Sequence, residues 1–311
     1  MRFGVIASTM LVAVLAGCSE QSVTQTEEGV FVLGSVEESG TSERGITPGE
    51  RTIVLQGFSG DILLRGVSGE TASFSFTRVA RADNRESATK LLDKIAISET
   101  GDETVFTVKM SSPEPARTAV EIVADIPSTT PVTIVTRSAN IKLVNMDGAV
   151  SIRNEAGSIE YSGASSSVDL KSRNGDVSLA LTAAAPGSTI SLETSNGDIM
   201  VSIPSGENLD VDATTSAGLV RNTGLNFTTA SLALSGAGGH LTGRVGTESD
   251  SRVIARTFHG DITFSASVDA IPSAPDDGDK SDSDVSQTPG DSLIIPADES
   301  EAAAQDPPEI P

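Results

Sequence analysis

A turn centred on glycine recurs along this chain, and its spacing constrains the fold more than any other feature. The last three steps of the series are 21 residues each. Asn-Gly and Gly-Asp pairs adopt positive φ at little cost and bend the chain between two alternating runs. One sharp turn per unit of this length is typical of a coil of a β-solenoid. The turn positions are Ala139, Gly157, Gly175, Gly197, Gly218, Gly239 and Gly260.

Apolar residues occupy fixed positions on both sides of each turn. Side chains of a strand alternate between its two faces, so apolar residues two apart point inward and the polar residues between them point to water. Faces this small are buried only when neighbouring coils stack. Seven and five residues before the turn, the columns are Val150 and Ile152, Val168 and Leu170, Ile190 and Leu192, Val211 and Ala213, Leu232 and Leu234, and Val253 and Ala255. Two residues after it, the column is Ile159, Val177, Ile199, Val220, Leu241 and Ile262.

We therefore expect an all-β chain with a single-stranded β-solenoid (β-helix) of about seven coils over residues 128–268. The chain has no Trp and one Tyr, which suits a thin core of aliphatic side chains rather than a thick globular one. Residues 50–127 are predicted to form a β-rich N-terminal part that carries one short helix. The turn at Gly60 repeats the solenoid register as a separated copy, and the helix is expected to begin near Asp83 and to cap the open end.

The N-terminus predicts a lipid anchor. A short positive start, an apolar stretch up to Leu15 and the run Leu15-Ala16-Gly17-Cys18 resemble the signal of bacterial lipoproteins, in which the cysteine becomes the acylated first residue. Cys18 is the only cysteine of 311 residues, which a lipid-bearing thiol would explain. The alternative is an ordinary signal peptide with an incidental buried cysteine. We expect residues 1–17 to be removed, 18–49 to be a flexible tether, and Ser19 to direct the protein to the outer membrane.

The C-terminal segment, residues 269–311, changes composition abruptly. It holds twelve acidic residues against one lysine and supplies half of the net charge of −22. Such a segment cannot bury enough apolar surface to offset its chain entropy, so we expect a disordered, solvated tail. A second interpretation is an electrostatic arm that contacts cationic components of the cell envelope or divalent ions. The negative charge argues against nucleic-acid binding.

The Asn-Gly-Asp-Ile turns that follow an N-terminal β region behind a lipobox resemble those of the DUF4097 β-strand-repeat proteins, an adhesin-like bacterial family. The resemblance covers roughly residues 50–266. It implies a β-helix and a location in the cell envelope, and it carries over no site residues.

The residues that directly follow each turn glycine are the candidates for a catalytic or metal-binding column. They are Ser158, Asp176, Asp198, Leu219, His240 and Asp261. A continuous metal ladder needs oxygen ligands at successive coils, which Leu219 and His240 interrupt. Asp176 and Asp198 are adjacent in this order and form a possible weak metal site, although Asp in a Gly-Asp turn is more often a turn former. His240 and His259 are expected to be solvated corner residues rather than general bases.

The sequence thus predicts a protein that is not an enzyme and needs no cofactor. We expect a structural or adhesin-like binding module held to the membrane by acyl chains such as palmitate, with an envelope protein or a glycan as its partner. Two alternatives stay open: a glycan-active solenoid enzyme, and a scaffold or sensor in envelope-stress signalling.

Overall fold

The computed structural model describes residues 23–26, 29–32, 34–164, 167–248 and 250–267. The described residues belong to one compact unit, within Met1–Asp269. Cys18 and the acidic tail lie outside the described residues, so the predicted anchor and tail are not tested by the structure. Among the described residues, the chain is all β with one short helix, α1 (Arg85–Leu92), and β1 (Val23–Thr26) pairs antiparallel with β2 (Gly29–Val32).

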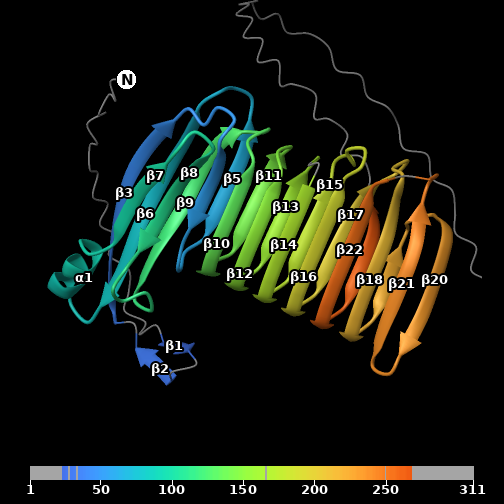
Figure 1. Ribbon diagram of the computed structural model, residues 1–311. Coiled ribbons are helices and arrows are strands. Elements are labelled where there is room, and N and C mark those ends of the chain that lie inside the picture. The colour runs from blue at the N-terminus through green and yellow to red at the C-terminus, as the bar shows by residue number, and fades with distance from the viewer. Residues whose placement is uncertain (1–22, 27–28, 33, 165–166, 249, 268–311) are drawn as a thin grey trace, which may run out of the picture. The chain divides into compact units, whose positions relative to one another are not determined.

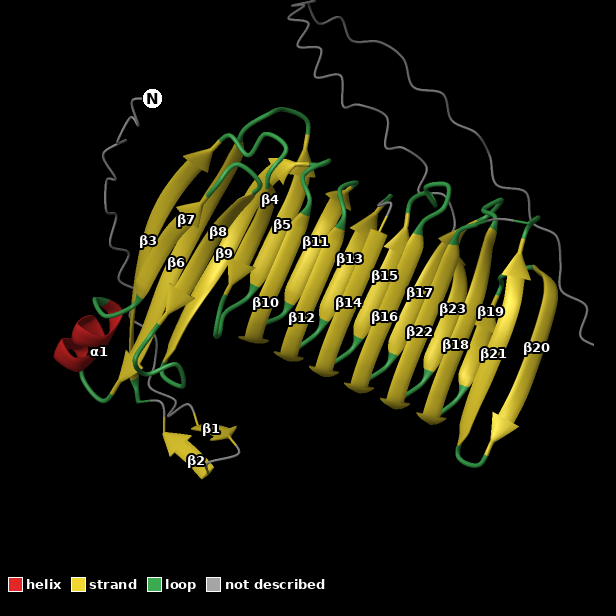
Figure 2. Cartoon of the chain, viewed as in Figure 1, coloured by secondary structure: helices red, strands yellow, loops and turns green. Residues whose placement is uncertain are grey.

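The remaining strands form two sheets whose inner faces enclose the core (Figures 1 and 2). In spatial order, the eleven-stranded sheet contains β20 (Phe227–Ser235), β21 (Gly238–Val245), β18 (Leu209–Ala217), β22 (Arg252–His259), β16 (Thr189–Asn196), β14 (Ser167–Asn174), β12 (Val150–Ala156), β10 (Val132–Ser138), β4 (Thr52–Gln56), β8 (Val105–Ser111) and β7 (Ala96–Gly101). The ten-stranded sheet contains β19 (Val220–Thr223), β23 (Ile262–Ser267), β17 (Ile199–Pro204), β15 (Val177–Leu181), β13 (Ile159–Gly163), β11 (Ile141–Met146), β5 (Ile62–Val67), β9 (Thr118–Pro127), β6 (Ala72–Ala82) and β3 (Val36–Ile46).

The middle of both sheets is a parallel stack in the predicted register. Ile152 pairs with Leu170, and Leu170 pairs with Leu192. These aliphatic side chains are 1% exposed or less, as the predicted inward columns require. Each coil contributes one strand to each sheet, joined by the glycine turn, so neighbouring coils bury one another's apolar faces. The solenoid-like prediction is thus confirmed for the central coils.

The order of the coils differs from their order in the sequence. Strands β22 and β23, the last of the described chain, pair with β16 and β17 on one side and with β18 and β19 on the other. The coil of β4 and β5 likewise lies between that of β8 and β9 and that of β10 and β11. The turn at Gly60 therefore stacks beside Ala139 as a separated copy. At each end of the stack, two coils that are consecutive in the sequence are separated by a third: the coil of β4 and β5 at one end, and the coil of β22 and β23 at the other.

The predicted coil at Gly239 is wrong. The residues around Gly239 form the antiparallel strands β20 and β21. Strand β21 also pairs antiparallel with β18. Leu232 and Leu234, assigned to the inward columns, are 57% and 76% exposed, whereas Leu241 is buried. Inward and outward side chains alternate in parallel and antiparallel strands alike, so the sequence pattern does not reveal in which direction a strand pairs. Both sheets are consequently mixed: the eleven-stranded sheet has antiparallel strands at both ends, and the ten-stranded sheet has them at the β3 end.

The predicted tether is also wrong in part. Within residues 18–49, β3 pairs antiparallel with β6 over eleven residues, from Val36↔Ala82 to Ile46↔Ala72. This strand is rich in Glu, Ser and Gly because it is an edge strand with many side chains in water, which made it look like a linker.

Helix α1 packs on β3 and β6 at the end of the stack remote from β20 (Figure 1). Its N-cap is Asn84, whose side chain accepts a hydrogen bond from the Ser87 N–H at 2.9 Å, rather than the predicted Asp83. Ala88, Leu91 and Leu92 of this helix are buried. No helix among the described residues has the length and apolarity needed to cross a membrane.

Candidate functional site

The glycine turns form a close-packed corner along the stack. Gly157, Gly175, Gly197, Gly260 and Gly218 have φ between +107° and +154° and follow one another in space. A Cβ on any of them would collide with the carbonyl oxygen of the turn residue in the neighbouring coil. Both the backbone conformation and this approach require glycine. These turns therefore have the structural role predicted for them, except at Gly239, which lies inside β21 and outside this corner.

A buried polar ladder lies beneath the glycine corner, three residues before each turn. Thr194 Oγ1 donates to the Gly175 carbonyl at 2.9 Å, and Thr257 Oγ1 donates to the Gly197 carbonyl at 3.0 Å. Both threonines are 5% exposed or less. The inward columns predicted from the sequence contain only apolar residues and leave out these Ser and Thr residues. Their position two residues after the inward Leu192 and Ala255 was the signal that could have placed them inside.

The carboxylates of the corner form a longer ladder than predicted. Because the coil of β22 and β23 inserts beside β16 and β17, Asp261 lies next to Asp198 rather than beyond Leu219 and His240. The Oδ1 atom of each carboxylate accepts the backbone N–H of the next coil at 2.8 Å: Asp176 from Asp198, Asp198 from Asp261, and Asp261 from Leu219. One oxygen of each Asp thus completes a turn, which is the turn-forming role.

Within the described residues, no cluster of three or more His, Cys, Asp or Glu side chains could hold a metal ion. The ladder geometry supplies the reason, because Asp176 and Asp198 each direct one oxygen into the corner rather than toward a shared point. The possible metal site at these two residues therefore gains no support from the geometry.

The two histidines lie on strands of the eleven-stranded sheet that β18 separates. His259, on β22, places Nδ1 at 3.2 Å from Asn196 Oδ1 and its ring edge-on to exposed Phe258, with centroids 4.5 Å apart. His240, on β21, lies with Nε2 at 3.6 Å from Asp212 Oδ1. Both side chains are exposed, as expected for corner and surface residues.

The outer face of the eleven-stranded sheet carries a pattern of opposite charges. Arg153 lies 3.5 Å from Asp169, and Lys171 lies 3.7 Å from Asp169 and 3.3 Å from Glu193. These groups are partly or fully exposed, so the pairs add little stability but keep this face charged and hydrated.

The outer face of the ten-stranded sheet is different. Lys142 and Glu160 form an ion pair of 2.8 Å on β11 and β13, and beyond them every outward residue on β15, β17 and β23 is small or uncharged up to Arg221 on β19. We call this surface the uncharged face. It consists of Val144, Ser162, Ser178, Ala180, Met200, Ser202, Thr263 and Ser265.

The uncharged face is hollowed. A shallow depression of about 340 Å³ lies over it. Its lining includes the long side chains of Lys142, Glu160 and Met200 and the short ones of Ser162 and Ala180. It forms because short side chains on consecutive strands stand between longer ones. A second depression of about 360 Å³ lies on the same sheet over β9, β5 and β11, and its border is charged, with Asp61 and Glu121.

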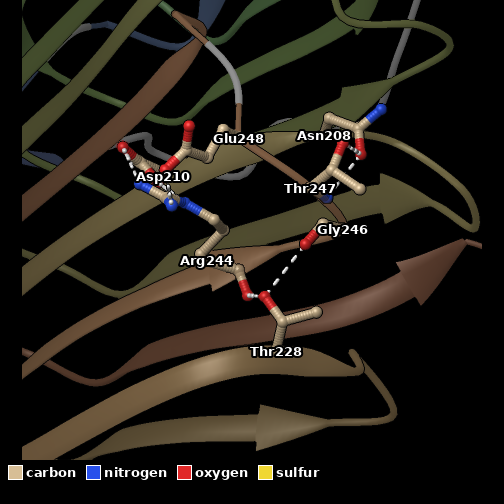
Figure 3. A network of polar contacts seen from close by, with 7 residues as sticks. All are labelled: Asn208, Asp210, Thr228, Arg244, Gly246, Thr247 and Glu248. Carbon is tan, nitrogen blue, oxygen red and sulfur yellow. Dashed lines mark hydrogen bonds and ion pairs between the residues drawn. The ribbon is translucent and has the colours of Figure 1, made fainter.

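A polar clamp holds β21 and β20 to β18 (Figure 3). Arg244 Nε donates to Asp210 Oδ1 at 2.7 Å and its Nη2 donates to Oδ2 at 3.3 Å. This guanidinium lowers the pKa of Asp210 through its hydrogen bonds, and the carboxylate raises the pKa of Arg244. Thr228 Oγ1 donates to the Gly246 carbonyl at 2.9 Å, which ties β20 to the end of β21.

Three solved structures are similar to this chain in part. The "putative cell adhesion protein" of Clostridium sporogenes is 13% identical, with a TM-score of 0.42, and the match covers 74% of this chain and 100% of that chain. The "putative adhesin" of Bacteroides fragilis is 9% identical (TM-score 0.36, 72% and 96% covered), and that of Parabacteroides merdae is 10% identical (TM-score 0.33, 73% and 96% covered). A comparison with curated proteins gave no match.

The family model described as Toastrack DUF4097 matches residues 50–265. The match spans the two sheets from β4 to β23 and includes the glycine corner and the uncharged face. It agrees with the resemblance drawn from the Asn-Gly-Asp turns. The chain belongs to the Toastrack DUF4097 family.

Proposed function

We propose that this protein is an adhesin-like binding module of the bacterial cell envelope, and that it contacts its partner through the uncharged face. The observation that carries the proposal is the contrast between the two sheets. One outer face bears interleaved charges, whereas the other presents eight uncharged side chains over a shallow depression. In a chain of net charge −22, a continuous surface without charge is unusual, and depletion of charged side chains is a feature of the cores of protein interfaces.

The chemistry of the uncharged face suits a partner with hydroxyl or amide groups. Ser162, Ser202 and Ser265 offer hydroxyls that donate and accept hydrogen bonds. Met200, 48% exposed, adds a flexible and polarizable apolar chain, which adapts to different contact shapes. A glycan or the surface of an envelope protein fits this mixture. A glycan-active enzyme would need carboxylates aimed into the depression, and the one bordering carboxylate, Glu160, is paired with Lys142.

The experiment for this function is a binding screen. The chain carrying Cys18→Ser, which cannot be acylated, is applied to arrayed glycans and to immobilised envelope proteins. The proposal expects saturable binding to at least one class that persists at high salt, because the face carries no charge to be screened. Absence of binding in both arrays, or binding abolished by moderate salt, contradicts it.

The membrane location rests on the sequence around Cys18. Each buried methylene contributes about 0.8 kcal/mol, so two or three acyl chains hold a protein on a bilayer almost irreversibly. Metabolic labelling with palmitate should mark the parent protein and not Cys18→Ser. Equal labelling of both proteins contradicts the anchor and leaves the binding proposal standing on its own test.

A further inference from the structure

The eleven-stranded sheet extends past the ten-stranded sheet at the end remote from α1. Strands β18 and β19 form the last coil, and β21 and β20 continue the larger sheet. Strand β19, the last of the other sheet, contacts β21, and β20 lies one strand farther out. Figure 1 shows this pair at the far end of the stack. The inward side of β20 is therefore open, and Leu232 and Leu234 are 57% and 76% exposed there.

Strand β20 is held in place although it is exposed. Its whole length pairs with β21, from Phe227↔Val245 to Ser235↔Gly238. The clamp of Figure 3 fixes its start through Thr228, and Asn208 Oδ1 accepts from the Thr247 N–H at 2.7 Å and from its hydroxyl at 2.9 Å. A pairing partner would thus meet an edge that is already ordered, which lowers the entropic cost of association.

Charge distinguishes β20 from the other edge strands of the two large sheets. Natural sheets use charged residues to keep their edges from pairing with other chains. In these two sheets the other described edge strands carry such residues, and the nine residues of β20 contain none. The charged edge residues are Glu37, Glu38, Glu43 and Arg44 on β3, Glu99 on β7, and Arg221 on β19.

We propose that the edge of β20 pairs antiparallel with β20 of a second copy of this chain. A two-fold axis at Ala233 would place Leu232 of each copy opposite Leu234 of the other, so that the two exposed leucines pair across the junction. No charged side chain meets its like in this arrangement. Pairing of β3 with itself would bring several carboxylates together.

The size of the contact sets its strength. With the axis at Ala233 the two strands overlap over residues 231–235, and five residues at about 3.3 Å each give a junction roughly 16 Å long, one strand wide, below the size of most specific interfaces. The dimer is therefore expected to be reversible and to depend on concentration. Each copy carries a large negative charge, so added salt should favour the dimer by screening the repulsion between copies.

The test compares sedimentation of three full-length proteins, all with Cys18→Ser to remove disulfide and acyl effects. The parent should dimerise with rising concentration, and more so at higher salt. Ala233→Lys places two like charges opposite each other and should stay monomeric. Ser195→Lys adds the same charge to an exposed position in the interior of the same sheet and should dimerise like the parent. Equal melting temperatures confirm that all three fold.

A cysteine series tests the antiparallel register. Ala233→Cys, near the proposed axis, should form a disulfide-linked dimer under mild oxidation. Thr229→Cys, on the same face but four residues away, lies about 26 Å from its counterpart and should not. A parent protein that stays monomeric at every concentration and salt, or an Ala233→Lys variant that dimerises like the parent, overturns the proposal. Equal crosslinking at both cysteines overturns the two-fold arrangement.

Discussion

Asp261 donates its backbone N–H to the Oδ1 atom of Asp198 at 2.8 Å, although the two residues are 63 positions apart. This bond joins the last described coil to the coil of β16 and β17. It exists because β22 and β23 insert between that coil and the coil of β18 and β19, which follows it in the sequence. The same insertion brings Gly260 over Gly197. The corner is thus continuous in space but not in sequence, and its integrity depends on residues from distant parts of the chain.

The first prediction concerns this corner. Gly197→Ala should be strongly destabilising, by several kcal/mol, because φ is +154° and the new Cβ would collide with the Gly175 carbonyl. Gly187→Ala is the matched control, since Gly187 also has positive φ, +71°, but its Cβ would meet nothing within 4 Å. Its cost should be about 1 kcal/mol. Chemical denaturation of both variants measures the difference, and equal costs would show that strain alone, and not the stacking, demands glycine.

The second prediction tests the inward register. Leu192 is 1% exposed, so Leu192→Asp buries an unpaired charge and should cost several kcal/mol. The neighbouring Glu193→Ala removes only an exposed ion pair with Lys171 and should cost less than about 1 kcal/mol. Melting curves of the two proteins compare them directly. A larger loss for Glu193→Ala would mean that the register is displaced by one residue.

The third prediction concerns the buried polar ladder. Thr194→Val keeps the shape of the side chain but leaves the Gly175 carbonyl without its hydroxyl donor, which should cost about 1–3 kcal/mol. Thr189→Val, at an exposed position of the same strand, should change the unfolding free energy by less than about 0.5 kcal/mol. If the two substitutions have equal effects in denaturant titrations, the ladder does not stabilise the stack.

The fourth prediction follows from the Arg244–Asp210 pair. Arg244 holds the pKa of Asp210 below its ordinary value, so the carboxylate stabilises the fold at every pH above its unfolded pKa. That stabilisation is lost as the pH falls through the lowered pKa of the folded state. The melting temperature of Asp210→Asn should therefore lie below that of the parent at about pH 7, and the gap should narrow toward about pH 3. A gap that is constant with pH would assign the effect to packing instead of charge.

The central coils could be predicted from the sequence because their constraint is local. The spacing of Val168, Leu170 and Val177 around their glycine turn lies within one repeat unit, and it is enough to place all three side chains inside. The order of the coils could not be predicted, because Val211 and Val253 occupy equivalent register positions and either could stack on Ile190. Only contacts between segments far apart in the sequence decide between them, and in the structure Ile190 pairs with Val253.

The uncharged face was within reach of the sequence but was not identified there. Its residues, such as Ser178 and Ala180, alternate with the inward column that contains Val177, so their outward direction follows from the same pattern. The difference in charge becomes visible only when the outward residues of the two sheets are compared. The depression itself depends on which strands are neighbours, since Ser202 and Ser265 become adjacent only through the insertion of β23.

Retention on purified envelope fractions tests the proposed binding face most directly. The proteins compared are the Cys18→Ser chain, the same chain with Ala180→Arg, and the same chain with Ser195→Arg. Ala180 lines the depression, so a long charged side chain there should weaken retention about tenfold or more, whereas Ser195→Arg on the opposite sheet should leave it unchanged. Equal retention of all three proteins, with equal melting temperatures, would contradict the assignment of the uncharged face as the contact surface.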